Sequence, residues 1–289
     1  PYSMICLSAL EKGQGSFPWM RWQRDILMQP RSDVESSSQG HGIRTMVGGV
    51  PVDAYSRSAL ANKLYLDSLD KSSPLPKLVF SMNGEGVYYF HKNDGFKACV
   101  LSADVVHADG MSVIKAGNKF TNTHFPERVA TTDLFHDLAR VCSEQGLSVF
   151  FLGGRESVVM KAYENVKKEY PELKLAGYHH GYFSSGSDDE KYLLEMLSTI
   201  KPHIVFVGLG RPRQEQWCID NRHRLSGITW LKTCGGLFDF LSGNSPRAPR
   251  WMIDSGLEWL YRLMKEPRRL FWRYLITNIY SLYCYRFKR

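Results

Sequence analysis

One carboxylate in this sequence has the position that acid–base chemistry requires. Asp109 directly follows the apolar run Val105-Val-His-Ala108 and precedes Gly110. A carboxylate at the end of a strand, facing a crevice, can act as a general base. The same residue can instead start a turn or cap the next helix, and spacing alone favours that structural role. His107 has no second ligand at the spacing of a metal site, so we expect it to be a packed residue.

A glycine-rich turn offers a second kind of chemistry, the binding of an anion. Gly208-Leu-Gly210 follows an apolar run and leads through Pro212 into a helical pattern. Backbone N–H groups at such a turn attract anions, and Arg211, Arg213 and Gln214 would lie beside them. A simple strand-to-helix connection with solvated arginines explains the same residues equally well.

The sequence argues against a catalytic metal. His179-His180 would suit one, but adjacent residues of an extended segment point to opposite sides, so we expect no site there. The one acidic cluster, Asp188-Asp189-Glu190, is typical of a helix start. The sequence contains no D-x-D motif, P-loop, G-x-G-x-x-G, G-x-S-x-G or H-E-x-x-H pattern. No standard motif in the sequence therefore identifies the ligand.

Alternating apolar and amphipathic runs predict the elements that carry these residues. Strands are expected at 78–82, 148–152, 203–207 and 228–232, and helices at 132–145, 156–170, 188–200 and 213–222. Apolar strands that end in glycine and lead into helices indicate an α/β fold, with a Rossmann-like parallel sheet flanked by helices. The ligand crevice of such a sheet lies at the carboxyl ends of its strands. The glycines expected there are Gly153, Gly154, Gly208, Gly210, Gly235 and Gly236.

The composition is that of a globular protein. The 289 residues, 43% hydrophobic and 23% charged, suffice for one large domain or two small ones. The 6 cysteines form no C-x-x-C pair, so we expect a reducing compartment rather than disulfides or structural zinc. No signal peptide is visible in the first residues. Residues 1–45 include a polar, Ser- and Gly-rich stretch, which predicts a flexible leader.

The net charge of +8 is concentrated at the C-terminus. From Asn244 to Arg289, ten Lys and Arg residues stand against three acidic ones, among ten aromatic residues. Residues 256–274 have apolar side chains near helical spacing, and Pro267 is expected to divide them into two short helices. Anionic lipid attracts such a segment by about 1 kcal/mol per basic residue. Because its longest uncharged run, 274–285, is too short to span a bilayer, we expect this basic aromatic appendage to lie on a membrane.

Eight motifs in order closely resemble those of the WecG/TagA/CpsF family of bacterial glycosyltransferases, over roughly residues 46–275. The motifs are Asp109-Gly110, Glu127-Arg-Val129 with Asp133-Leu134, Phe151-Leu-Gly-Gly154, Gly177-Tyr-His-His-Gly-Tyr-Phe183, Gly208-Leu-Gly-Arg-Pro-Arg-Gln-Glu215, Cys234-Gly-Gly-Leu-Phe-Asp239, Arg247-Ala-Pro249 and Gly256-Leu-Glu-Trp-Leu-Tyr-Arg262 with Glu266-Pro-Arg268. One departure is Thr131, where the family often has Gly.

The resemblance implies an inverting transferase that moves a sugar from a UDP-sugar to a sugar carried on undecaprenyl pyrophosphate, without a metal or other cofactor. By matching position, Asp109 would be the catalytic base, with Arg128 and Gln214 in the pocket. Ser81, where the family usually has Thr, and Asn83 would contact the substrate. The glycines at the strand ends would line the substrate site. The arginines expected at the lipid pyrophosphate or the membrane are Arg262, Arg268, Arg269 and Arg273.

These inferences divide the chain into the leader (1–45), an α/β catalytic domain (46–255) and a membrane-docking helical appendage (256–289). The enzyme would be peripheral on the inner, cytoplasmic face of the cell membrane, and a homo-oligomer would fit the family. N-acetylmannosamine is the expected sugar, with UDP-glucose as the alternative donor. A nucleic-acid-binding protein, whose basic aromatic tail stacks on bases, and a noncatalytic membrane adaptor are the competing interpretations. Neither requires Asp109 or Gln214, so we expect no nucleic-acid partner.

Overall fold

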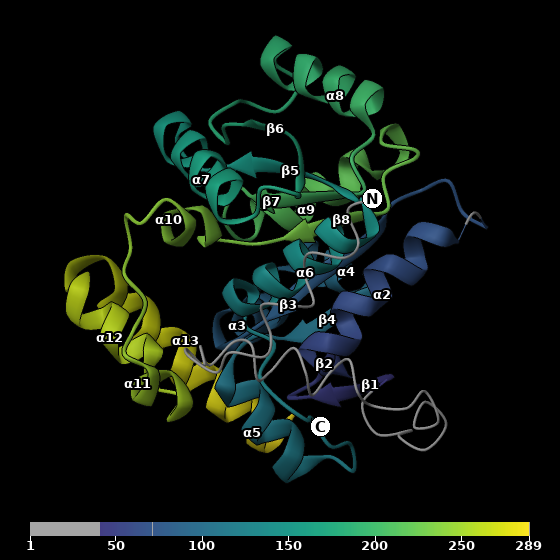
Figure 1. The fold of residues 1–289 in the computed structure, drawn as a ribbon. Coiled ribbons are helices and arrows are strands. Elements are labelled where there is room, and N and C mark those ends of the chain that lie inside the picture. The colour runs from purple at the N-terminus through teal and green to yellow at the C-terminus, as the bar shows by residue number, and fades with distance from the viewer. Residues whose placement is uncertain (1–40, 71, 289) are drawn as a thin grey trace, which may run out of the picture. The chain divides into compact units, whose positions relative to one another are not determined.

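The computed structural model describes residues 41–70 and 72–288, and a central sheet with helices on both faces confirms the α/β prediction (Figure 1). The strands are β1 (His41–Val47), β2 (Val50–Tyr55), β3 (Lys77–Met82), β4 (Val105–Ala108), β5 (Ser148–Gly153), β6 (Lys174–His179), β7 (Ile204–Gly208) and β8 (Trp230–Thr233). The helices are α2 (Arg57–Leu69), α3 (Gly84–Lys92), α4 (Asp94–Leu101), α5 (Met111–Phe120), α6 (Thr131–Gln145), α7 (Glu156–Glu169), α8 (Asp188–Ile200), α9 (Arg213–Asn221), the 3-10 turn η2 (Arg222–Arg224), α10 (Leu237–Leu241), α11 (Arg250–Asp254), α12 (Glu258–Lys265) and α13 (Pro267–Phe287).

The sheet brings the carboxyl ends of its seven parallel strands to one edge. Its order is β1-β2-β4-β3-β8-β7-β5-β6, and only the β1–β2 pair of this sheet is antiparallel. The register pairs Met82 of β3 with Ala108 of β4, and Gly153 of β5 with Gly208 of β7. The loops that follow β3, β4, β5, β7 and β8 therefore meet at the edge where ligands bind in such sheets.

Both faces of the sheet are covered, which explains the apolar runs of its strands. In β3, Leu78 and Phe80 pack into the core beneath α3, α4, α5, α8, α9 and α13. Val79 between them packs into the opposite core, beneath α2, α6, α7 and α10. The predicted helices α6, α7, α8 and α9 thus each bury an apolar stripe against one face.

The hairpin of β1 and β2 was not predicted. Gly48 and Gly49 form its turn with φ of +60° and +76°, a conformation that glycine adopts without steric cost. Strand β1 begins at His41, inside the expected leader of residues 1–45. The rest of that leader, residues 1–40, lies outside the described residues.

The C-terminal helices pack on the sheet domain. Pro267 separates α12 from α13 as expected, but the prediction of two short helices is wrong for α13, which has 21 residues. This helix continues because its inner face is buried against α3 and α5: Leu270 and Cys284 are fully buried, and the Tyr285 hydroxyl lies 3.2 Å from Ser112 Oγ. Among the described helices, none is long and apolar enough to span a membrane.

Candidate functional site

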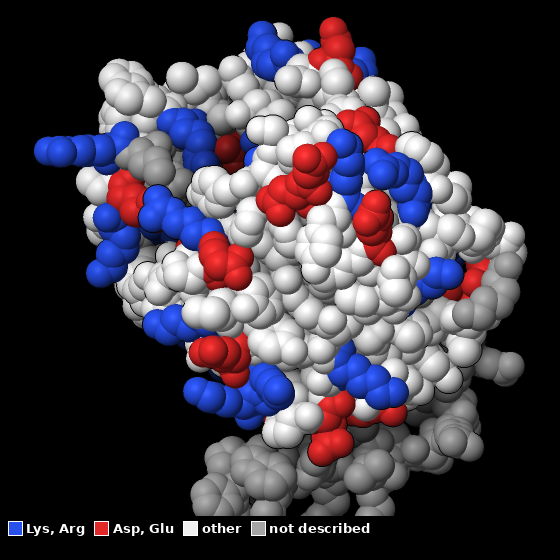
Figure 2. Space-filling view, turned by 90° about the horizontal axis from the view of Figure 1, so that it is seen from above, with Lys and Arg blue, Asp and Glu red and all other residues white. Residues whose placement is uncertain are grey.

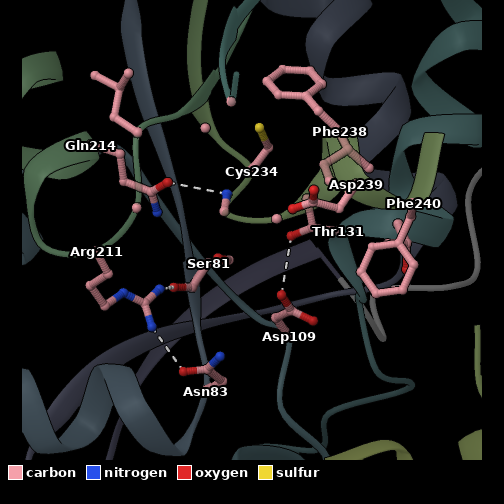
Figure 3. Close-up of a pocket in the computed structure, with 18 of the residues that line it drawn as sticks. Ser81, Asn83, Asp109, Thr131, Arg211, Gln214, Cys234, Phe238, Asp239 and Phe240 are labelled. Carbon is pink, nitrogen blue, oxygen red and sulfur yellow. Dashed lines mark hydrogen bonds between the residues drawn. The ribbon is translucent and has the colours of Figure 1, made fainter. Parts of the chain in front are cut away.

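A cavity of about 550 Å³ lies at the carboxyl edge of the sheet. We call it the strand-end cavity. Its lining includes Ser81 of β3 and Gly208 of β7, together with Asp109 and Cys234, which directly follow β4 and β8. The close-up shows side chains from these separate strands pointing into one space (Figure 3). The structure therefore brings together residues that are far apart in the chain, with Ser81 and Arg273 at the extremes, 192 positions apart.

Asp109 is fixed from two sides at the end of β4. Its backbone N–H donates to the carbonyl oxygen of Met82 at 2.9 Å, which ties the end of β4 to the end of β3. The Thr131 hydroxyl donates to Asp109 Oδ2 at 3.1 Å (Figure 3). The side chain of Asp109 is 21% exposed, and it lines the cavity. Thr131, which stands where the family often has Gly, thus donates a hydrogen bond to the expected base.

Arg128 lies between two carboxylates. Its NH1 donates to Glu258 Oε2 at 2.8 Å, while its NH2 lies 3.7 Å from Asp109 Oδ1. Its Nε donates to the backbone oxygen of Asp109 at 2.6 Å. Burial disfavours the guanidinium charge, but the two carboxylates outweigh burial and raise the pKa of Arg128. The guanidinium is therefore charged and held at the end of β4.

A buried network supports the cavity floor. Arg211 donates to the Ser81 carbonyl at 2.6 Å and to Asn83 Oδ1 at 2.8 Å. Gln214 accepts from the N–H of Gly235 at 3.1 Å, and its own amide donates to Glu215 Oε1 at 2.8 Å. Three of these bonds are drawn in Figure 3. Gln214 and Arg211 therefore hold three strand ends in place, a role that motif spacing did not suggest.

The strand-end glycines allow close backbone approach. A Cβ on Gly153 would lie 2.3 Å from the Gly208 oxygen, so this position packs the turn and does not line the cavity. Gly210 and Gly235 have φ of +78° and +54°, and a Cβ would enter open space there. Gly154, Gly208 and Gly236 also line the cavity. These glycines therefore put backbone without side chains on the wall of the cavity, while the N–H of Gly235 itself donates to Gln214.

A second cavity, of about 570 Å³, adjoins the first. We call it the helix-side cavity, since α5, α12 and α13 form its walls. The residues that line both cavities are Asn83, Glu85, Asp109, Arg128, Glu258, Arg262 and Arg273. The expected base and three arginines therefore lie where the two spaces meet.

The arginines predicted in the tail divide into two groups. Arg262 and Arg273 line both cavities, and Arg273 pairs with Glu85 of α3 at 3.5 Å. Arg268 is exposed and lines neither cavity. The side chain of Arg269 lies outside the described residues.

His179, His180 and Asp189 form a group of metal-ligand types within the described part of the chain. The expectation that the two rings point apart is wrong: β6 ends at His179, and both Nε2 atoms approach Asp189, at 3.3 and 3.6 Å. His180 Nδ1 accepts the N–H of Tyr182 at 3.2 Å, which places the ring proton on Nε2 and makes it a donor. His179 and Asp189 alone are too few for a metal site. None of the three lines the strand-end cavity.

Other expectations have clear outcomes. His107 is packed as predicted, with no exposed surface, and burial beside Lys232 lowers its pKa. Asp188 begins α8 as predicted.

Glu258, which lines both cavities and bonds Arg128, is a residue that the sequence analysis missed. It lies inside the last resembling motif, but nothing in its spacing shows that it meets Arg128, 130 positions away.

Comparison with known proteins identifies the family of this chain. Residues 45–289 match the family model described as the glycosyl transferase WecG/TagA/CpsF family. The chain is similar to the N-acetylglucosaminyldiphosphoundecaprenol N-acetyl-beta-D-mannosaminyltransferases of Bacillus subtilis (strain 168), with 30% identity, and Bacillus spizizenii (strain ATCC 23059 / NRRL B-14472 / W23), with 32%. The matched regions cover 74% and 69% of this chain, and 81% and 74% of those relatives. The chain belongs to the WecG/TagA/CpsF family of glycosyltransferases.

Proposed function

We propose that this protein transfers N-acetylmannosamine from a UDP-sugar to an N-acetylglucosamine carried on undecaprenyl diphosphate, with inversion at the anomeric carbon. The names of the two Bacillus relatives support the transferred sugar and the acceptor. The observation that carries the proposal is the place of Asp109, where two cavities meet. One cavity suits a nucleotide donor and the other a lipid-linked acceptor.

The strand-end cavity suits the donor. It lies at the carboxyl ends of parallel strands, the usual place for nucleotides in such sheets. Gly210 and Gly235 keep side chains out of it, and Arg128, Arg262 and Arg273 line its border with the second cavity. Preorganised donors of this kind can stabilise the charge of a leaving diphosphate by several kcal/mol.

The helix-side cavity suits the acceptor. Lys115, Arg262 and Arg273 supply positive charge for its diphosphate, and Tyr274 and Leu282 of α13 are among its walls. Leu282 is also one of the exposed apolar residues of that helix. An acceptor in this cavity would have its sugar beside Asp109 and its lipid near the surface of α13.

The chemistry needs one base and one leaving group. Asp109 takes the proton of the acceptor hydroxyl as that oxygen bonds to the anomeric carbon of the donor sugar. The bond between this carbon and the UDP oxygen breaks on the opposite face, which inverts the configuration. UDP leaves with the electron pair of that bond, and the arginines and backbone N–H groups meet its charge. In this scheme the arginines stabilise the negative charge of the leaving diphosphate, as a bound metal ion does in metal-dependent glycosyltransferases.

The surface of α13 supports docking on a membrane. Its exposed apolar residues recur every three or four positions, on the face opposite to its buried one. They are Phe271, Trp272, Leu275, Ile276, Ile279, Leu282, Tyr283 and Phe287. Lys and Arg side chains project at the left of Figure 2, the side on which α12 lies in Figure 1. Apolar burial and attraction to anionic headgroups together favour an interfacial helix. Since nucleotide sugars are cytoplasmic, this surface would meet the inner face of the cell membrane.

The test is a transfer assay with short-chain N-acetylglucosaminyl diphosphate lipid and either UDP-N-acetylmannosamine or UDP-glucose. We expect UDP release and a disaccharide-lipid product with the first donor. Transfer from UDP-glucose alone would refute N-acetylmannosamine as the transferred sugar, but it would still support a glycosyltransferase. No transfer with either donor, together with salt-sensitive binding of single-stranded DNA and no binding to anionic vesicles, would favour the nucleic-acid interpretation.

A further inference from the structure

We infer that Glu258 is a positioning residue, which holds the guanidinium of Arg128 away from the catalytic oxygen of Asp109. The inference rests on the proposed function, since it assumes that Asp109 is the base. It also links the active site to the appendage, because Glu258 is the first residue of α12.

The two oxygens of Asp109 have different surroundings. Oδ2 accepts a hydrogen bond from the Thr131 hydroxyl at 3.1 Å. Oδ1 lies 3.7 Å from Arg128 NH2, too far for a hydrogen bond. Oδ1 is thus the oxygen left to take a proton from an acceptor hydroxyl.

Arg128 could close on that oxygen if Glu258 did not hold it. Its Nε is anchored on the Asp109 backbone at 2.6 Å, so its terminal nitrogens can reach a carboxylate on either side. Glu258 holds NH1 at 2.8 Å. The exposed fractions of the three side chains are low: 18% for Arg128, 21% for Asp109 and 12% for Glu258. Solvent therefore screens the attraction between the guanidinium and the two carboxylates little.

Loss of the Glu258 charge changes this balance. The guanidinium stays charged, and Asp109 becomes its nearest carboxylate. A closer Arg128 would hydrogen-bond Oδ1 and make Asp109 a weaker base, because a nearby positive charge favours the ionised carboxylate. The other charged residues that line the shared space or act on these groups from neighbouring elements are Glu85, Lys115, Asp133, Lys232, Asp239, Arg262 and Arg273.

The arrangement also makes the base depend on the seating of α12. Gly256, at φ +76°, turns the chain into α12, and a Cβ there would lie 2.8 Å from Met111. Glu258 follows this turn directly. Displacement of α12 would remove Glu258 from Arg128 and let Arg128 close on Asp109. Transfer would then be favoured only while α12 lies on the catalytic domain.

The test compares Glu258→Gln with Glu258→Asp, and uses Asp254→Asn, an exposed acid of the adjacent α11, as the control. For Glu258→Gln we expect kcat for transfer to lipid-linked acceptor to fall at least 10-fold, with the KM for donor and binding to anionic vesicles nearly unchanged. The acidic limb of its kcat–pH profile should move to lower pH. Glu258→Asp should keep part of the activity, and Asp254→Asn all of it.

A second arm isolates Arg128. If Glu258 acts through Arg128, then Glu258→Gln should have little further effect on kcat or on the pH profile in an Arg128→Gln background. A wild-type kcat and pH profile in Glu258→Gln, or an equal loss in both backgrounds, would overturn the inference. If the Gln variant does not fold, the Asp variant decides by the same pH shift. An inactive wild-type protein would instead refute the proposed function.

Discussion

At the scale of single residues, the sequence pointed to Asp109 but not to its contacts. A carboxylate after an apolar strand is a local pattern, and the family resemblance added the expected role of base for Asp109. Its hydrogen bond from Thr131 and the pairing of Arg128 with Glu258 are contacts across 22 and 130 positions. Such contacts depend on how the chain folds back, so no local pattern contains them.

The first prediction concerns the base. Asp109→Asn should lower kcat by roughly 10² to 10⁴, the usual contribution of a general base. UDP binding and the melting temperature should change little, because Asn can still accept from Thr131 and Arg128 keeps Glu258. Turnover and isothermal titration with UDP measure the two effects. A variant with near wild-type turnover would exclude Asp109 from the role.

The second prediction concerns metal. Arg128, Arg262 and Arg273 line both cavities, and His180 Nδ1 already accepts the N–H of Tyr182. EDTA should therefore leave the transfer rate essentially unchanged. Activity that is lost on chelation and restored by Mg²⁺ or Mn²⁺ would contradict this and reopen Asp188, Asp189 and Asp239 as ligands.

At the scale of elements, apolar runs predicted the sheet interior well. The predicted strand at 78–82 and helix at 188–200 match β3 and α8 closely, because both faces of the sheet are buried and the helices are amphipathic. Strands β1 and β2 were missed because the Gly48-Gly49 turn follows a polar stretch. Helix α13 was predicted too short because its exposed face is apolar while its buried face includes the polar Thr277 and Ser281, so no helical period was visible beyond Tyr274.

The third prediction concerns Lys232 of β8. It is fully buried, its Nζ donates to the Thr233 oxygen at 2.6 Å, and burial lowers its pKa from 10.5 to about 8. Below pH 8 the folded and unfolded chains both carry the proton, and the penalty for the buried ammonium is fully present. Between pH 8 and 10.5 only the unfolded chain is protonated, so the contribution of Lys232 to stability rises with pH.

Lys232→Met should therefore raise the free energy of unfolding at pH 7, by about 1 kcal/mol or more. Its advantage over the wild type should shrink between pH 8 and 10, by up to about 1.4 kcal/mol per pH unit. Urea denaturation at four pH values measures this, with the exposed Lys191→Met as the control. A variant that is less stable at pH 7, or an advantage that does not change with pH, would show that the ammonium is better accommodated than its burial indicates.

At the scale of the whole molecule, the appendage does two things at once. Its inner face completes the core and the cavities through Leu270, Tyr285 and Glu258, while its outer face is apolar. Removal of the whole appendage would expose the core and deprive Arg128 of Glu258, as well as abolish the proposed docking. A sharp test of docking must therefore change the outer face alone.

The last prediction makes that separation. Ile276→Ser together with Ile279→Ser removes apolar surface from two side chains that are 51% and 61% exposed. Because each side chain is already about half buried, transfer of its remaining surface into a membrane contributes about 1 kcal/mol, so loss of both should weaken binding to anionic vesicles at least 10-fold. Transfer to a vesicle-bound acceptor should fall in parallel, while UDP binding and turnover with a water-soluble short-chain acceptor are kept. The control is Leu66→Ser, which changes an exposed residue of α2, far in the sequence from α13, and should not change vesicle binding. If the double variant still pellets with vesicles like the wild type, α13 is not the docking surface, and the basic residues around it become the next candidates.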